Sequence, residues 1–127
     1  MITKSRPVLA VILAGFWVSG SEFFRNEILL KPHWLQHYDS LGVDYPSAPV
    51  NGMIWVLWSF LFALAVYWLS RKFTLLETAL FSWFVGFVWM WLVIGNLGVL
   101  PFSILPLAVP LSLLEVFLAA WICVKVG

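Results

Sequence analysis

Long, almost uninterrupted apolar runs dominate the chain. Four of them stand out, at about residues 7–24, 53–70, 75–97 and 102–124. A helix that spans a bilayer needs about 20 apolar residues, within a range of roughly 17–25. The runs are continuous rather than alternating, and a membrane barrel would need roughly eight or more strands. The pattern therefore predicts an all-α polytopic membrane protein, a single domain (residues 1–127) of four transmembrane helices.

Polar and turn-forming residues separate these runs. "PSAPVNG" ends the polar stretch at about 25–52 and precedes the second run, and "GNLGVLP" separates the third from the fourth. The third run opens with "TLLE", which fits a capping box in which Thr74 accepts from a free backbone amide and Glu77 reaches back. We assign Glu77 to this cap rather than to a functional site.

The stretch "KPHWLQHYDSLG" predicts a further short helix. Pro32 suits a first helical turn, and Trp34, Tyr38 and Leu41 then recur at the spacing of one helix face. The opposite face carries His33, Gln36, His37 and Ser40. We expect an amphipathic helix that lies at the membrane surface with its aromatic face among the lipid headgroups.

Composition agrees with a lipid environment. The chain is 63% hydrophobic and 10% charged, whereas soluble domains are about 45–50% apolar and about 25% charged. The net charge of +1, without a basic cluster, excludes nucleic acid as a partner. Cys123 is the single cysteine, which excludes an intrachain disulfide and a thiolate metal cage.

The basic residues favour one orientation. With four crossings, the side shared by the two termini holds five basic residues and the other side two. The five are Lys4, Arg6, Arg71, Lys72 and Lys125, and the two are Arg25 and Lys31. By the positive-inside rule, both termini are cytoplasmic, the 25–52 loop faces outward, and the location is a cell membrane of the bacterial inner-membrane type.

The first run also has a rival interpretation. Lys4 and Arg6, followed by "PVLAVILAGFWV" and then "SGS", are typical of a cleavable secretory signal. The helix-like continuation "SEFFRNEILL" favours an anchor that stays in place.

Glu115 lies in the middle of the fourth run, with no Lys, Arg or His within nine residues on either side. An ionised group at mid-bilayer costs about 2.5–3.5 kcal/mol or more. Ser112 and small residues share its helix face, so we expect burial against another helix as a neutral acid that acts as a polar strut. The alternative is a proton- or cation-binding carboxylate in a transport path, together with Asn96.

Two further clusters are candidate sites. Glu22, near the outer end of the first helix, is expected to form an interfacial ion pair with Arg25 or Lys31. His33 and His37 are spaced i, i+4 and could bind a metal with oxygen ligands from Asp39 and Asp44. We favour the simpler interpretation, in which both histidines lie on a solvent-facing surface. No histidine lies within a predicted span, so haem is excluded; no cofactor and no catalytic residue is assigned.

Tryptophans recur deep in the third run. Trp83, Trp89 and Trp91 could line a pocket for an apolar ligand such as a lipid or quinone. Packing and lipid contact are the simpler explanation, and we prefer it.

The order of these parts resembles that of small bacterial four-helix integral membrane proteins of uncharacterised function. The resemblance is carried by "LAGFWVSG", "HWLQHY" and "TLLETAL". It implies the fold and no activity.

Three classes of function stay open. We favour a small interaction or accessory subunit whose small-residue faces pack against itself, as a homo-oligomer, or against a partner membrane protein. The alternatives are an oligomeric transporter or channel that uses Glu115, and a membrane enzyme with an outer-surface His/Asp site.

Overall fold

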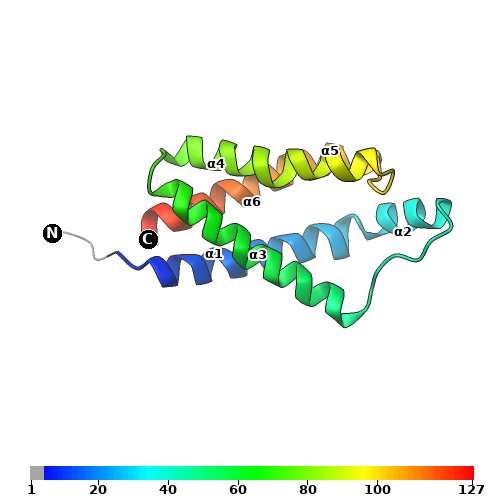
Figure 1. The fold of residues 1–127 in the computed structure, drawn as a ribbon, viewed down its shortest axis with the longest axis horizontal. Coiled ribbons are helices and arrows are strands. Elements are labelled where there is room, and N and C mark those ends of the chain that lie inside the picture. The colour runs from blue at the N-terminus through cyan, green and yellow to red at the C-terminus, as the bar shows by residue number, and fades with distance from the viewer. Residues whose placement is uncertain (1–4) are drawn as a thin grey trace.

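The computed structural model describes residues 5–127 and is helical, with no strand in that range. Four helical rods pack side by side along the long axis of the molecule (Figure 1). The first rod is α1 (Pro7–Phe23), which the π-helical η1 (Phe24–Leu29) continues, and the second is α3 (Pro49–Ser70). The third joins α4 (Leu75–Trp83), the π-helical η2 (Phe84–Val88) and α5 (Trp89–Asn96). In the fourth, the 3₁₀ turn η3 (Phe102–Ile104) leads into α6 (Leu105–Val126), while the short α2 (Lys31–Ser40) lies between the first two rods in the chain.

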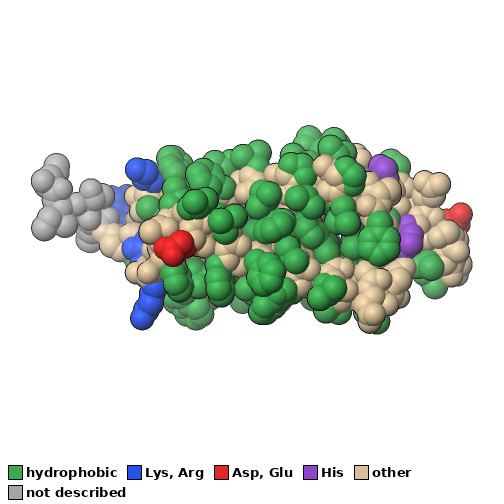
Figure 2. Space-filling view, turned by 90° about the horizontal axis from the view of Figure 1, so that it is seen from above, with side chains coloured by type: hydrophobic (Ala, Val, Ile, Leu, Met, Phe, Trp, Pro, Cys, Tyr) green, Lys and Arg blue, Asp and Glu red, His purple; other side chains and the backbone are tan. Residues whose placement is uncertain are grey.

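All four rods are long and apolar enough to cross a membrane. They have 23, 22, 22 and 25 residues, and their mean hydropathies run from 1.6 to 2.2. Hydrophobic side chains cover the middle of the face drawn in Figure 2, with Lys and Arg side chains near one end and the histidines near the other. The prediction of an all-helical chain with four such helices is confirmed.

The two ends of the bundle differ in what they hold. The described N-terminal segment and the C-terminus lie together at one end, which we call the terminal end (Figure 1). There the Arg6 backbone amide donates to the carbonyl of Val126 at 3.1 Å. Helix α2 lies at the opposite end, which we call the α2 end. Lys4, one of the five basic residues counted above, is outside the described residues.

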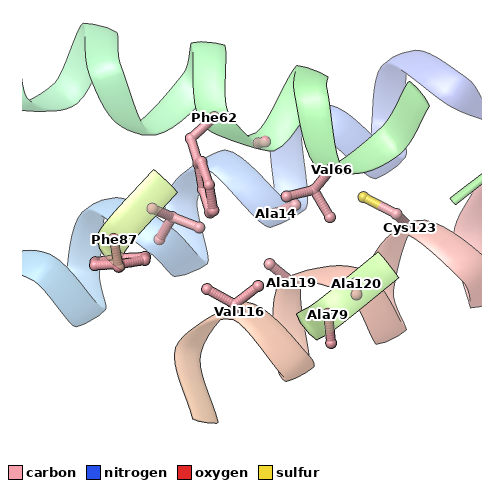
Figure 3. Close-up of a cluster of buried hydrophobic side chains, with 11 residues drawn as sticks. Ala14, Phe62, Val66, Ala79, Phe87, Val116, Ala119, Ala120 and Cys123 are labelled. Atoms are coloured by element: carbon pink, nitrogen blue, oxygen red, sulfur yellow. The ribbon is translucent and has the colours of Figure 1, made fainter. Parts of the chain in front are cut away.

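Small residues let the rods approach closely inside the chain. Ala10, Ala14 and Val18 of α1 are fully buried, as are Ala119 and Cys123 of α6. Figure 3 shows several of these side chains meeting at the centre of the bundle with larger ones from α3 and η2. The small-residue faces that the sequence offered for a partner are therefore used within one copy of the chain.

The capping box at the start of α4 is confirmed. The backbone amide of Glu77 donates to Thr74 Oγ1 at 3.2 Å, and the amide of Thr74 donates to Glu77 Oε1 at 3.1 Å.

The first helix extends further than its predicted end near residue 24. It continues as η1 to Leu29, so Arg25 and Asn26 belong to the helix rather than to the loop. The short prediction has a local cause: "RNE" interrupts the apolar run, while the structure buries both Arg25 and Asn26.

Trp34 and Tyr38 of the α2 apolar face contact the protein, whereas Leu41, which the sequence placed on the same face, is exposed. Trp34 packs against the buried side chains of Leu30, Leu100 and Ile104, and its Nε1 donates to Asn26 Oδ1 at 3.2 Å. These contacts bury apolar area and satisfy two polar groups at once, which explains why Trp34 turns toward the protein.

Candidate functional site

A charged trio lies inside the bundle where α1, η1 and α6 meet. The side chains of Glu22, Arg25 and Glu115 are only 3%, 4% and 0% exposed. Arg25 Nη2 donates to Glu22 Oε1 at 2.6 Å, and Arg25 Nη1 donates to Glu115 Oε1 at 3.1 Å. A planar guanidinium with several fixed donors suits this bridging role, which a point-like ammonium would not fill.

The local chain geometry brings the trio together. Glu22 and Arg25 are three residues apart, a spacing that places them on the same helix face. The guanidinium of Arg25 also lies over the ring of Phe87 in η2, 5.4 Å from its centroid. Arg25 lies in η1 and Phe87 in η2, and both segments are π-helical, a variation of the helix that is frequent at functional sites.

The charges of the trio do not balance. With both carboxylates ionised, two negative charges face one guanidinium, a formal sum of −1. Glu115 Oε2 is buried and has no hydrogen-bond partner among the described residues. Leaving a buried charge without compensation is costly. The trio therefore calls for one further positive charge, which either a proton or a cation could supply.

A line of polar contacts continues from the trio to α2. Asn26 Nδ2 donates to Glu22 Oε2 at 3.1 Å, and Asn26 Oδ1 accepts from Trp34 Nε1 at 3.2 Å. On the other side, Trp17 Nε1 donates to the backbone carbonyl of Glu115 at 2.9 Å. Four elements, α1, η1, α2 and α6, are thus joined through buried or half-buried polar groups.

A cavity of about 410 Å³ lies directly beside this line, and we call it the α2-end pocket. Glu22, Arg25 and Asn26 supply its charged and strongly polar floor. Six aromatic side chains contribute to the walls: Trp34, Tyr38, Tyr45, Trp55, Trp58 and Trp91. An apolar cavity of this size with a few convergent polar groups is typical of small-molecule sites.

A second hollow of about 330 Å³ lies on the other side of the trio, between α1 and α6. We call it the lateral groove. Arg25 and Glu115 contribute to its lining, and the remaining residues are mostly apolar, including Phe16, Leu111 and Leu114. Because Arg25 borders both hollows, the trio lies between the α2-end pocket and the lateral groove.

Four polar residues of the predicted spans were candidates from sequence: Glu115, Ser112, Asn96 and Glu22. The structure brings two of them together, Glu115 and Glu22. The expectation that Glu115 lacks a cationic partner is wrong, because Arg25 is 90 positions away in the sequence but within hydrogen-bond distance. Glu22 does pair with Arg25, although the pair is buried rather than at an exposed interface.

The other two candidates lie apart from the trio. Ser112 Oγ accepts from Trp83 Nε1 at 2.9 Å and donates to the carbonyl of Val109 at 3.0 Å, so it links α4 to α6. Asn96 is exposed at the end of α5.

The two histidines attach α2 to the segment between α5 and α6. His33 Nδ1 lies 2.9 Å from Ser103 Oγ, and His37 Nε2 lies 2.7 Å from the carbonyl oxygen of Gly98. Asp39 and Asp44 are exposed. Within residues 5–127, no group of three or more His, Cys, Asp and Glu side chains is placed to hold a metal ion. The interpretation that we favoured from sequence placed both histidines on a solvent-facing surface. In the structure both side chains are half-buried, and each contacts a polar partner.

The pocket differs in composition from the one considered on the third helix. Of the three tryptophans named there, Trp91 lines the α2-end pocket, Trp89 is exposed, and Trp83 is engaged by Ser112. The sequence reasoning missed Arg25 and Asn26 as floor residues. The i, i+3 spacing of Glu22 and Arg25 in "SEFFRN" was the available signal.

No protein-family model, curated protein or solved structure matches the chain. Function must therefore be inferred from the site itself.

Proposed function

We propose that this chain is a multi-pass membrane protein that binds a small ligand in the α2-end pocket. The observation that carries the proposal is a buried, charged floor beneath aromatic walls in a cavity of about 410 Å³. Burying three charged groups is expensive in a bundle whose core is mainly apolar. A ligand that completes their charge and hydrogen bonding gives that arrangement a use.

The membrane placement is part of the proposal. Large apolar side chains such as Val8, Leu92 and Trp68 are exposed on the outside of the rods, where lipid would cover them. Basic residues gather at the terminal end, which favours a cytoplasmic position for it, in a membrane of the bacterial inner-membrane type. The α2-end pocket would then open toward the outside of the cell.

Transport is a second candidate, favoured by the lateral groove. Arg25 borders both hollows, so a change in the pairing of the trio would alter the wall between them. Both hollows form within one copy of the chain, so this candidate does not require an oligomer.

The accessory-subunit and enzyme hypotheses rest on features that now have partners within the chain. The accessory-subunit hypothesis rested on small-residue faces, and those of α1 and α6 are buried inside the chain. The enzyme hypothesis rested on His33 and His37, whose ring nitrogens contact a serine hydroxyl and a backbone carbonyl. Neither hypothesis gains an observation of its own.

Native mass spectrometry of the protein, released from nanodiscs equilibrated with an extract of the source cells, tests the binding function. We expect a bound small molecule of defined mass on the unchanged protein. Ile94→Trp, which places a larger side chain in the pocket lining, should lose it. Leu92→Trp, two residues away on the 71% exposed outer side of α5, should retain it. Equal occupancy in both variants, or no bound molecule at all, would contradict the proposal.

A further inference from the structure

We infer that the ligand of the α2-end pocket is a monovalent organic cation of the quaternary-ammonium class. This inference rests on the proposed binding function and adds the charge and chemical class of the ligand. The charge balance of the floor and the aromatic composition of the walls support it independently.

The charge balance of the floor favours a cation. Glu22 and Arg25 line the pocket, and Glu115 lies directly behind them on the same guanidinium. With both carboxylates ionised their formal sum is −1, and the carboxylate that faces the pocket itself is Glu22, while Glu115 lines the lateral groove. Lys31 is paired with Glu27 at 2.5 Å, and its ammonium lies over the ring of Tyr45, 5.5 Å from the centroid. With both carboxylates ionised, a cation bound against Glu22 would bring the formal charge of this region to zero without any change in these pairs.

The walls suit a cation without hydrogen-bond donors. Trp34, Tyr38 and Tyr45 contact one another, with ring centroids 5.1–6.4 Å apart, and form one side of the pocket. Trp55 and Trp58 of α3 form another, with centroids 6.3 Å apart. The negative faces of aromatic rings attract cations, and cages of such rings recognise quaternary ammonium groups.

Tyr45 contributes no competing charge at neutral pH. Burial, assisted by the negative charge of Glu27 and by Tyr38, raises the pKa of Tyr45 to about 12. Its ring is therefore a neutral phenol across the physiological range.

Anions and metal ions fit this site less well. An anion would meet the Glu22 carboxylate and a guanidinium that already serves two carboxylates. A divalent metal ion needs several oxygen or nitrogen ligands. The carboxyl oxygens of Glu22 are engaged by Arg25 and Asn26, and most of the remaining lining is aromatic or aliphatic.

Three probes of nearly equal size and shape separate the effect of charge from that of shape. They are choline (+1), its neutral carbon analogue 3,3-dimethylbutan-1-ol, and the anion 3,3-dimethylbutanoate. Binding to the purified full chain in detergent can be followed by tryptophan fluorescence, because four tryptophans line the pocket. We expect choline to bind at least about tenfold more tightly than the neutral analogue, and the anion to bind most weakly.

Matched variants place this preference at the floor. Glu22→Gln makes the formal charge of the trio zero and keeps an acceptor for Arg25, so the preference for choline over the neutral analogue should fall about tenfold. Glu77→Gln makes the same chemical change at the exposed start of α4, at a residue that does not line the α2-end pocket, and should leave the preference intact. If Glu22→Gln fails to fold, Trp55→Leu removes a wall ring at a partly exposed position and should weaken choline more than the neutral analogue.

Every outcome of these binding measurements either supports or overturns the cation inference. Equal or tighter binding of the neutral analogue would overturn the cation inference and leave the binding function standing. Choline binding that Ile94→Trp does not change, or absence of choline binding, would also overturn it. The proposed binding function is contradicted by a different result, in which Ile94→Trp and Leu92→Trp carry the same amount of bound small molecule.

Discussion

At the scale of single residues, Arg25 has the largest number of roles in the site. Its guanidinium bridges Glu22 and Glu115, lies over the ring of Phe87, and borders both hollows. Removing one member of a buried ionic group is strongly destabilising, because the partners stay buried without compensation. Arg25 is therefore the residue whose loss should affect folding most directly.

Arg25→Gln should lower the free energy of unfolding by about 3–5 kcal/mol, because two buried carboxylates lose their only cation in the trio. Denaturant titration in mixed micelles measures this change. The matched control is Glu115→Gln, which keeps the shape of the side chain and brings the formal sum of the trio to zero. It should change stability by less than about 1 kcal/mol. Equal losses in the two variants would contradict the charge balance described for the trio.

Tyr45 gives a pH-dependent prediction. Its pKa is about 12 in the folded protein against an ordinary value of 10.0, so at alkaline pH the unfolded chain loses this proton first. This pKa difference adds to the free energy of unfolding below pH 10. The added stability is lost as pH rises from about 10 through about 12. Melting temperatures recorded from pH 9 to 11 should fall more steeply for the unchanged protein than for Tyr45→Phe. Parallel curves would show that Tyr45 is not shielded in the pocket wall.

Individual residues differ in how well the sequence predicted their roles. The burial of Glu115 followed from its apolar surroundings and small neighbours. Its partner did not, because Arg25 is 90 positions away and only the tertiary packing of α1 against α6 brings the two together. Local spacing can identify the Glu22–Arg25 pair, but it carries no information about a third member from another helix.

At the scale of elements, α2 acts as a cover that is attached on two sides. Trp34 bonds to Asn26 beneath it, and the two histidines contact the segment between α5 and α6. These contacts hold Tyr38 and Trp34 in the wall of the pocket. The position of the cover therefore depends on a few polar contacts, each of which contributes only about 0.5–1.5 kcal/mol.

His37→Ala should loosen α2 without unfolding the bundle. The contact between His37 Nε2 and the carbonyl of Gly98 is lost, so backbone amides of α2 should exchange with deuterium several-fold faster, at a cost of roughly 1 kcal/mol. Exchange in α3 and α6 should not change. Gln36→Ala, at an exposed position on the same helix, serves as the control. Faster exchange throughout the chain would show that the contact supports the whole fold rather than the cover.

The sequence predicted helices better than their ends or neighbours. Continuous apolar runs indicate spanning helices because such runs have few other stable uses. The extension of the first helix through η1 could not be read in this way, since Arg25 and Asn26 look like loop residues until their partners are known. Likewise, the spacing of Trp34 and Tyr38 identifies an apolar face of α2, but it does not say whether lipid or protein covers that face.

At the scale of the whole molecule, the arrangement of the rods makes the site possible. Helix α1 packs against both α3 and α6, and α4 packs against α6, through small buried residues. Toward the α2 end, the rods leave room for the pocket, whereas nearer the terminal end Ala14, Ala119 and Cys123 fill the centre (Figure 3). The α2-end pocket thus lies beyond the part of the core that these small side chains fill.

The orientation of the bundle gives a prediction that covers the entire chain. In a background of Cys123→Ala, a cysteine at Ser40 should react with an impermeant thiol reagent added to intact cells, because the α2 end is proposed to face outward. A cysteine at Lys72, in the link between α3 and α4, should react only after the membrane is opened. Both positions are exposed, so a difference in labelling reports the side of the membrane. The reverse pattern would place the pocket on the cytoplasmic side.

The most direct test of a cation site in the α2-end pocket is an anomalous-scattering crystal structure with arsenocholine. This analogue carries arsenic in place of the choline nitrogen, so the position of its positive centre can be located by the anomalous signal. Our account predicts one arsenic peak inside the pocket, between the Glu22 carboxylate and the rings of Trp34, Tyr45 and Trp55. A peak in the lateral groove, or a pocket that stays empty at saturating arsenocholine, would contradict it.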